Sequence, residues 1–203
     1  MNRKMNELMM TDIVQSIYYN EASDILRREI AVILDRVWPP DVSPIPGETI
    51  PTTHEAVLNA RSFYSYVDGR LVSYAGVVRK TINHNDQTFN IAGLSCVATD
   101  PDYQGRGLGL RTVAAATRWI EQSDTDFGIF TCKPSLAYFY ERAGAWPVVP
   151  DVALIGSRDD GALSSESLQV AVLMRLFSAK ARTRESMLRH TTIDLGLPVG
   201  HFL

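Results

Sequence analysis

The chain has 203 residues, of which 45% are hydrophobic and 21% charged. This composition is typical of one folded domain and excludes a chain that is disordered throughout. The net charge of -3 argues against a nucleic-acid partner, because duplex binding relies on clustered Lys and Arg, and favours a cationic ligand. The first ten residues carry no signal-peptide apolar stretch, and no run approaches membrane-spanning length, so we expect a cytoplasmic protein without membrane contact.

The first predicted element is an amphipathic helix over residues 21–37, preceded by a polar lead-in. Its apolar residues recur at helical spacing, and Asn20 or Ser23 could cap its start. Trp38-Pro39-Pro40 ends it, and further prolines keep the chain irregular to about Thr53. This long loop has two interpretations, a lid or binding wall and a plain surface connector.

An antiparallel meander follows a short helical stretch predicted over residues 53–61. Residues 62–67 and 70–78 are β-rich and flank Asp68-Gly69, which is a strong hairpin signal. A second reversal near residues 83–86 leads into a third strand over residues 89–98. The sequence therefore predicts three consecutive antiparallel strands.

The remaining elements complete an α+β plan around one mixed, mostly antiparallel sheet. We expect a helix over residues 107–122, a buried strand over 127–132, and a short helix over 134–143 with Gly144 just past its end. Residues 152–155 and 169–176 have the pattern of a last hairpin, and the tail over 178–203 is expected to fold back. We predict a single domain over residues 1–203, with a core at about 60–146 and a C-terminal hairpin and tail over 147–203.

A glycine-rich loop joins the third strand of the meander to the next helix. In such a position, successive backbone N–H groups can point into one concavity, and the helix dipole makes it attractive to a pyrophosphate. A dinucleotide-binding fingerprint would require a glycine where Leu110 stands, and the Gly-Lys-Ser/Thr tripeptide of a P-loop is absent from the sequence. The loop residues are Gln104, Gly105, Arg106, Gly107, Leu108 and Gly109. Arg106 is either a charge at the rim of the site or a solvated side chain.

This Gln-x-x-Gly-x-Gly pattern resembles the acetyl-CoA-binding motif of the GNAT superfamily of acetyltransferases. Residues 127–132 and 136–145 also resemble the strand and the aromatic helix that follow in that superfamily, and the likeness covers about residues 60–146. The resemblance implies a sheet that splays at the cofactor, a pantetheine arm paired with Cys96, Val97 and Thr99, and a pyrophosphate held by the loop amides of residues 104–109.

The resemblance also implies direct attack of an amine on the acetyl-CoA thioester. The backbone N–H of Val97 would polarise the carbonyl, and Tyr140 matches the tyrosine that protonates the departing sulfur. The neighbouring Tyr138 is the second candidate for this acid, and the aromatic cluster must also supply core residues.

The first helix with its acidic loop, the strand over residues 69–78, the segment over 140–146, the Asp159-Asp160 loop and a C-terminal tail with an aspartate form a wider pattern. In this pattern the chain is similar to aminoglycoside 2'-N-acetyltransferases, in which acidic groups receive the ammonium groups of the drug. The matching candidates are Asp41, Glu48, Asp159, Asp160, Asp194 and the carboxylate at Leu203. Each of them also has an interpretation as a solvated surface acid. Ser95 stands where that family carries a glutamate that serves as base, which suits a less polycationic acceptor such as kasugamycin.

Other functions remain open. The same fold could acetylate another small amine or a protein N-terminus, or it could bind acetyl-CoA as a non-catalytic sensor. The histidines show no paired metal-ligand spacing, so no metal is expected. Cys96 and Cys132 lie in apolar runs and are expected to be small buried hydrophobes rather than a disulfide or a nucleophile. An exposed hairpin and an apolar tail would allow a homodimer.

Overall fold

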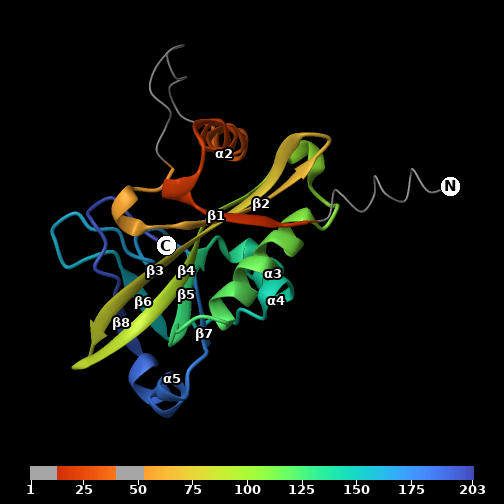
Figure 1. Ribbon diagram of the computed structural model, residues 1–203. Coiled ribbons are helices and arrows are strands. Elements are labelled where there is room, and N and C mark those ends of the chain that lie inside the picture. The colour runs from red at the N-terminus through yellow and green to blue at the C-terminus, as the bar shows by residue number, and fades with distance from the viewer. Residues whose placement is uncertain (1–12, 40–52) are drawn as a thin grey trace. The chain divides into compact units, whose positions relative to one another are not determined.

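The computed structural model describes residues 13–39 and 53–203, and its central feature is a six-stranded mixed sheet (Figure 1). In spatial order the strands are β1 (Gln15–Tyr18), β2 (Arg61–Val67), β3 (Arg70–His84), β4 (Gln87–Thr99), β5 (Phe127–Cys132) and β7 (Ala171–Leu176). The β1–β2, β2–β3 and β5–β7 pairs are antiparallel, whereas β4 and β5 are parallel. A second sheet joins β6 (Val152–Ile155) to β8 (Thr191–Asp194).

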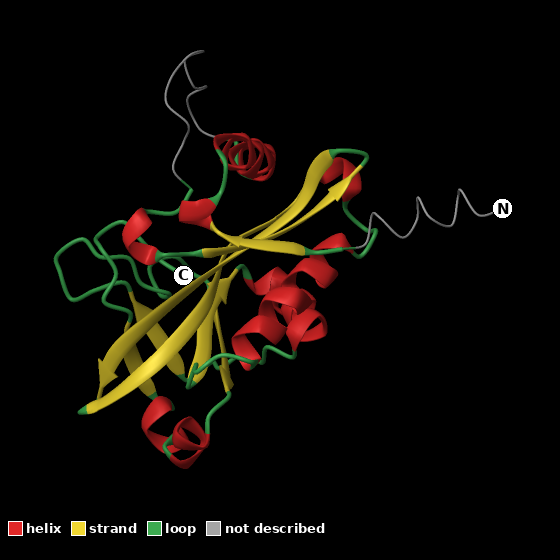
Figure 2. Cartoon of the chain, in the orientation of Figure 1, coloured by secondary structure: helices red, strands yellow, loops and turns green. Residues whose placement is uncertain are grey.

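The helices are α2 (Asp24–Val37), α3 (Leu108–Glu121), α4 (Ala137–Gly144) and α5 (Ala179–Thr183), and Figure 2 distinguishes them from the strands by colour. The predicted α+β class with a mixed, mostly antiparallel sheet and flanking helices is therefore confirmed. The chain separates into two compact units. The first unit takes its described residues from 1–78 and 96–116, and the second comprises 79–95 and 117–203.

In the first unit, α2 is stabilised by an N-cap residue at its start and by an apolar stripe along one of its faces. The Ser23 hydroxyl accepts a hydrogen bond from the Leu26 N–H at 3.2 Å, which selects Ser23 over Asn20 as the N-cap. Ile30 and Ile33 are almost completely buried. From the same helix, Glu29 accepts a hydrogen bond from the Tyr66 hydroxyl on β2.

Strand β1 contradicts the prediction of a polar lead-in before the first helix. It is only four residues long and none of its residues is fully buried. A strand of this kind needs no alternation of apolar and polar residues, which is why the sequence pattern did not reveal it. Its backbone pairs with β2, from Gln15 opposite Tyr64 to Tyr18 opposite Arg61. The helical stretch predicted over residues 53–61 was also wrong, because only Ala56–Leu58 form a 3-10 turn and β2 already begins at Arg61.

Two two-residue turns explain why the hairpin predictions were right. Asp68 and Gly69 both have positive φ, 50° and 76°, and so do Asn85 and Asp86, 47° and 57°. Positive φ at both central residues matches the right-handed twist of the flanking strands. In each case, asparagine, aspartate or glycine accepts this backbone region at low cost.

The second unit contains the largest error of the sequence prediction. Strand β6 does not form a hairpin with β7, since it pairs in parallel with β8, from Val152 opposite Thr191 to Ile155 opposite Asp194. Strand β7 instead pairs with β5 along its whole length. Two short apolar runs separated by a polar loop have the local pattern of a hairpin, but a parallel strand 39 residues further along the chain pairs with the same backbone groups.

The end of α4 also differs from the prediction, because the left-handed residue past the helix is Ala145, with φ 52°, and Gly144 is the last helical residue. Position 144 requires glycine because there is no room for a side chain. A Cβ there would lie 2.4 Å from the Thr117 Oγ1 atom and 2.6 Å from the Trp146 Nε1 atom. These two atoms are joined by a hydrogen bond of 2.9 Å, which satisfies the buried indole.

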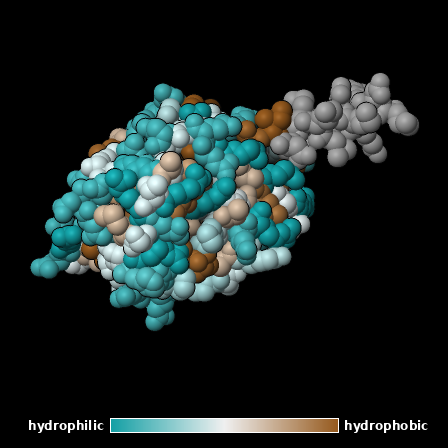
Figure 3. All heavy atoms as spheres, turned by 90° about the horizontal axis from the view of Figure 1, so that it is seen from below, coloured by the Kyte–Doolittle hydropathy of each residue, from teal (hydrophilic) through white to brown (hydrophobic). Residues whose placement is uncertain are grey.

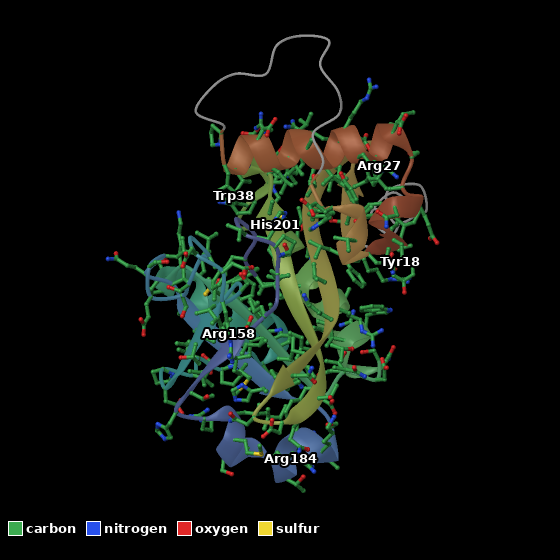
Figure 4. All side chains as sticks on the ribbon, turned by 90° about the vertical axis from the view of Figure 1, so that its left-hand side faces the viewer. Tyr18, Arg27, Trp38, Arg158, Arg184 and His201 are labelled. Carbon is green, nitrogen blue, oxygen red and sulfur yellow. The ribbon has the colours of Figure 1, made fainter. Side chains whose placement is uncertain are left out.

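The tail folds back along β6, as predicted. Leu195 and Leu197 are buried, and their N–H groups donate to the carbonyls of Ile155 and Gly156. The tail also contains α5 and β8, two elements that the sequence prediction did not include. Figure 4 labels His201 in its last stretch and Arg158 in the loop after β6.

The face drawn in Figure 3 is mostly hydrophilic, with hydrophobic residues scattered over it in small groups. Among the helices within the described ranges, none combines the length and the apolar character that crossing a membrane would require.

Candidate functional site

The glycine loop of the first unit has the backbone conformation that an anion-binding loop needs. Strand β4 ends at Thr99, a 3-10 turn covers Pro101–Tyr103, and α3 starts at Leu108. Gly105 and Gly107 have φ of 75° and 76°, a region that glycine reaches at no steric cost. A Cβ at Gly105 would meet no atom within 4 Å, so the loop surface there is open. Its amides precede the α3 N-terminus, where the helix dipole favours negative charge.

Two side chains of the loop stabilise it by hydrogen bonds to nearby backbone carbonyls. The Gln104 amide donates to the Thr99 carbonyl at 3.1 Å. The Arg106 guanidinium donates to the Asp102 carbonyl at 3.1 Å and lies over the Tyr103 ring, 4.9 Å from its centroid. Arg106 is nevertheless exposed, so its charge is held at the surface of the loop.

Asp100 fixes the start of this loop. Its side chain is only 1% exposed and forms ion pairs with Arg36 of α2, at 3.1 Å, and with Arg70 of β3, at 2.6 Å. It also accepts the Asp102 N–H at 3.0 Å. A buried carboxylate with this many donors holds the backbone firmly. Apart from the Asp-Pro pair, no local pattern in the sequence indicated this role.

The last residues of β4 depart from a regular strand. Cys96 has φ 53°, which is uncommon for a residue with a side chain. Residues 91–94 are buried, whereas Ser95, Cys96 and Val97 are half-buried. Residues held in sparsely populated backbone regions cluster at functional sites, and Cys96 is one of the residues for which the family resemblance predicts a pantetheine contact. The predicted pairings of Cys96, Val97 and Thr99 with the cofactor stay predictions.

Tyr140 occupies the buried face of α4 in the second unit, with 6% of its surface exposed. Its ring meets Phe130 and Phe139 edge to face, each with centroids 5.0 Å apart. Burial raises the pKa of the Tyr140 hydroxyl, and the nearby Cys132 thiol adds to the effect. The hydroxyl is therefore protonated at neutral pH, as an acid must be. Tyr138 is 69% exposed and stacks under Arg142, which favours Tyr140 of the two candidates.

A buried polar cluster in the first unit was not predicted. The Tyr74 hydroxyl lies 2.9 Å from His54 Nε2 and 3.0 Å from the Ser62 hydroxyl. Burial lowers the pKa of His54 to about 4. Burial also raises the pKa of Tyr74, against the opposing hydrogen bond from Ser62, and the neighbouring Cys96 adds to the rise. The run Thr53-His54 carries no periodicity that could have indicated a core histidine.

The predicted substrate-binding acids differ in their surroundings. Asp41 and Glu48 lie outside the described residues. Asp159 and Asp160 are exposed on the loop after β6, where Asp159 accepts a hydrogen bond from Ser157. Asp194 ends β8 and forms an ion pair with Arg158 at 3.3 Å.

Leu203 lies beside β5. Its backbone oxygen accepts hydrogen bonds from the Thr131 N–H at 3.0 Å and from the Thr131 hydroxyl at 2.5 Å. Its side chain approaches Gly93 of β4. The sequence offered no signal for this position, because it depends on how the tail is routed after β8.

Neither cysteine forms a disulfide, and Cys132 is buried whereas Cys96 is half-buried. Burial raises the pKa of the Cys132 thiol to about 11, which keeps it protonated and a poor nucleophile. Within residues 13–39 and 53–203, no group of three or more His, Cys, Asp or Glu side chains could hold a metal ion.

The family is decided by a sequence match. The Acetyltransferase (GNAT) domain family matches residues 20–148, which is more than half of the chain. The chain belongs to the GNAT acetyltransferase family. It is accordingly an acyltransferase that uses acyl-CoA. Residues 104–107 of this GNAT chain lie between β4 and α3, whereas Leu108 and Gly109 are the first two residues of α3.

Solved structures share the fold of this GNAT chain. Escherichia coli ElaA has a TM-score of 0.53 and 14% identity, over 80% of this chain and 99% of ElaA. An acyl-CoA N-acyltransferase from Pseudomonas aeruginosa has a TM-score of 0.52 and 14% identity, over 80% of this chain and 98% of that one. A probable N-acyltransferase from Enterococcus faecalis, with 15% identity and a TM-score of 0.49, is matched over 66% of this chain, which spans only 31% of that protein. No curated protein matches the sequence.

Proposed function

We propose that this GNAT chain is an acetyl-CoA-dependent N-acetyltransferase acting on a small cationic amine. The observation that carries the proposal is the pair of left-handed glycines, Gly105 and Gly107, directly before the α3 N-terminus. In this conformation the loop amides and the exposed Arg106 suit the pyrophosphate of the donor. Cys96, Val97 and Thr99 would hold its pantetheine arm.

The reaction would be a direct transfer. The neutral amine attacks the thioester carbonyl carbon, the C–N bond forms, and the C–S bond breaks. The Val97 N–H would stabilise the oxyanion, and the Tyr140 hydroxyl would give its proton to the departing thiolate. The amine proton would leave to solvent, because Ser95 has no carboxylate with which to take it, and solvent would return a proton to the Tyr140 oxygen.

For the acceptor, we propose the 2'-amino group of an aminoglycoside, and kasugamycin as the first compound to test. The support comes from the likeness of the sequence to aminoglycoside 2'-N-acetyltransferases and from the exposed acids Asp159 and Asp160. The pairing of Asp194 with Arg158 and the serine at position 95 both reduce the negative charge available to the acceptor. These features favour an acceptor with few ammonium groups over a kanamycin-type drug.

The test has two stages. Calorimetric titration with acetyl-CoA measures donor binding, and thiol release in the presence of kasugamycin, kanamycin, a polyamine or a short peptide then identifies the acceptor. We expect acetyl-CoA binding and thiol release with kasugamycin, and mass spectrometry should show one added acetyl group on the drug. A protein that binds no acetyl-CoA would refute the proposal as a whole.

The other outcomes separate the alternatives. Release with the polyamine or the peptide alone would refute the aminoglycoside acceptor and keep the acetyltransferase. Tight binding without release on any amine would favour a non-catalytic sensor. A homodimer, which we also propose, would appear as a doubled mass in light scattering of the same sample.

A further inference from the structure

Strands β4 and β5 separate soon after they meet. Their parallel pairing joins Ile91 to Phe127 and Ala92 to Gly128, and within the described residues it extends no further. Strand β5 continues for four more residues with its other edge fully paired to β7. The second unit therefore contains a gap that starts after Ala92 and Gly128 and runs between residues 93–95 of β4 and 129–132 of β5.

Leu203 lies in this gap, with its side chain at the closed end. On the β5 side, its backbone oxygen accepts hydrogen bonds from both the N–H and the hydroxyl of Thr131. On the β4 side, a Cβ at Gly93 would lie 2.9 Å from Leu203 Cδ1 and 2.6 Å from the Ile129 carbonyl oxygen. Glycine at 93 is what admits the leucine, since any side chain there would collide with it or with β5.

The tail fixes Leu203 in this place through a series of contacts along its length. Strand β8 pairs with β6, the Leu197 N–H donates to Gly156 at 2.6 Å, and His201 donates its N–H to the Pro198 carbonyl at 3.0 Å. The position of Leu203 is thus set by the fold of the second unit. Leu203 is also half-buried, so part of its surface remains available to a ligand.

We propose that Leu203 limits the length of the acyl group that this acyltransferase accepts. The inference rests on the proposed function, in which the pantetheine arm enters between the diverging strands from their open end. The thioester is then the innermost part of the donor, and carbons added to the acyl group extend toward the closed end. Leu203 takes up the room that a propionyl or butyryl chain would need there.

The experiment compares the unaltered protein with Leu203→Ala. Affinities for acetyl-, propionyl- and butyryl-CoA are measured by calorimetry, so the readout needs no acceptor amine. We expect the unaltered protein to bind acetyl-CoA best. Leu203→Ala should improve the butyryl-to-acetyl and propionyl-to-acetyl affinity ratios by about fourfold for each added methylene, the gain expected from burying it.

Val199→Ala is the matched control, since Val199 belongs to the same tail but is 51% exposed, and its ratios should equal those of the unaltered protein. If Leu203→Ala does not fold, Leu203→Val should shift the ratios in the same direction by a smaller factor. Unchanged ratios in a folded variant that still binds acetyl-CoA overturn the role of Leu203 and leave the proposed function intact. An unaltered protein that binds none of the three thioesters overturns the proposed function, and this inference with it.

Discussion

Acidification should destabilise this protein through His54, a histidine that is 4% exposed. In the folded protein, burial lowers the pKa of His54 from 6.5 to about 4. In the unfolded chain, the imidazole binds a proton below about pH 6.5. Between these values the unfolded state holds more protons, so the stability contribution is present above pH 6.5 and is lost as the pH falls toward 4.

The size of the effect follows from the two pKa values. Integrating the difference in bound protons gives a loss of about 2 kcal/mol between pH 7 and pH 4.5. In urea unfolding, with an m-value of roughly 2 kcal/mol per molar, this shifts the midpoint by about 1 M.

His54→Gln isolates the contribution, because glutamine can hydrogen-bond to the Tyr74 hydroxyl and does not titrate. The variant should lose about 2 kcal/mol less than the unaltered protein over the same pH range. Acidic groups such as Asp126, whose pKa is lowered by its hydrogen bonds with Ser178, Asn90 and Lys180 in spite of its burial, titrate in both proteins and cancel. His190→Gln serves as the control, since this side chain is 86% exposed. Equal losses in the unaltered protein and in His54→Gln would refute the reasoning.

Three further outcomes follow from the structure. Tyr140→Phe should lower kcat by about tenfold or more with little change in acetyl-CoA affinity, and unchanged turnover would remove Tyr140 from the mechanism. Gly105→Ala should strain the loop by roughly 1 kcal/mol or more and weaken acetyl-CoA binding in calorimetry. The control is Gly69→Ala in a hairpin turn, where φ is 76° and the space is equally free, so it should carry the same strain and bind acetyl-CoA normally. Equal affinities of the two variants would show that the loop does not bind the cofactor. Ser23→Ala should cost about 1 kcal/mol in thermal or urea unfolding by removing the α2 cap, and an unchanged midpoint would contradict the cap.

The sequence alone determined the features that depend on neighbouring residues. Asp68-Gly69 encodes its hairpin because the turn needs two residues that accept positive φ. The glycines at 105 and 107 encode the loop before α3 for the same reason, and the apolar stripe with Ser23 encodes α2. The family and the fold class follow from these local patterns in their order along the chain.

Only the tertiary structure decided the features that depend on partners far away in the sequence. Strand β6 pairs with β8 and not with β7, and no local pattern in residues 152–155 indicates this partner. The Tyr74 hydroxyl meets His54 and Ser62 because strands and loops bring these residues together across 20 and 12 residues. Leu203 reached Thr131 across 72 residues. Pairings of this kind are set by the global packing of the chain, since each local segment could satisfy its backbone in several ways.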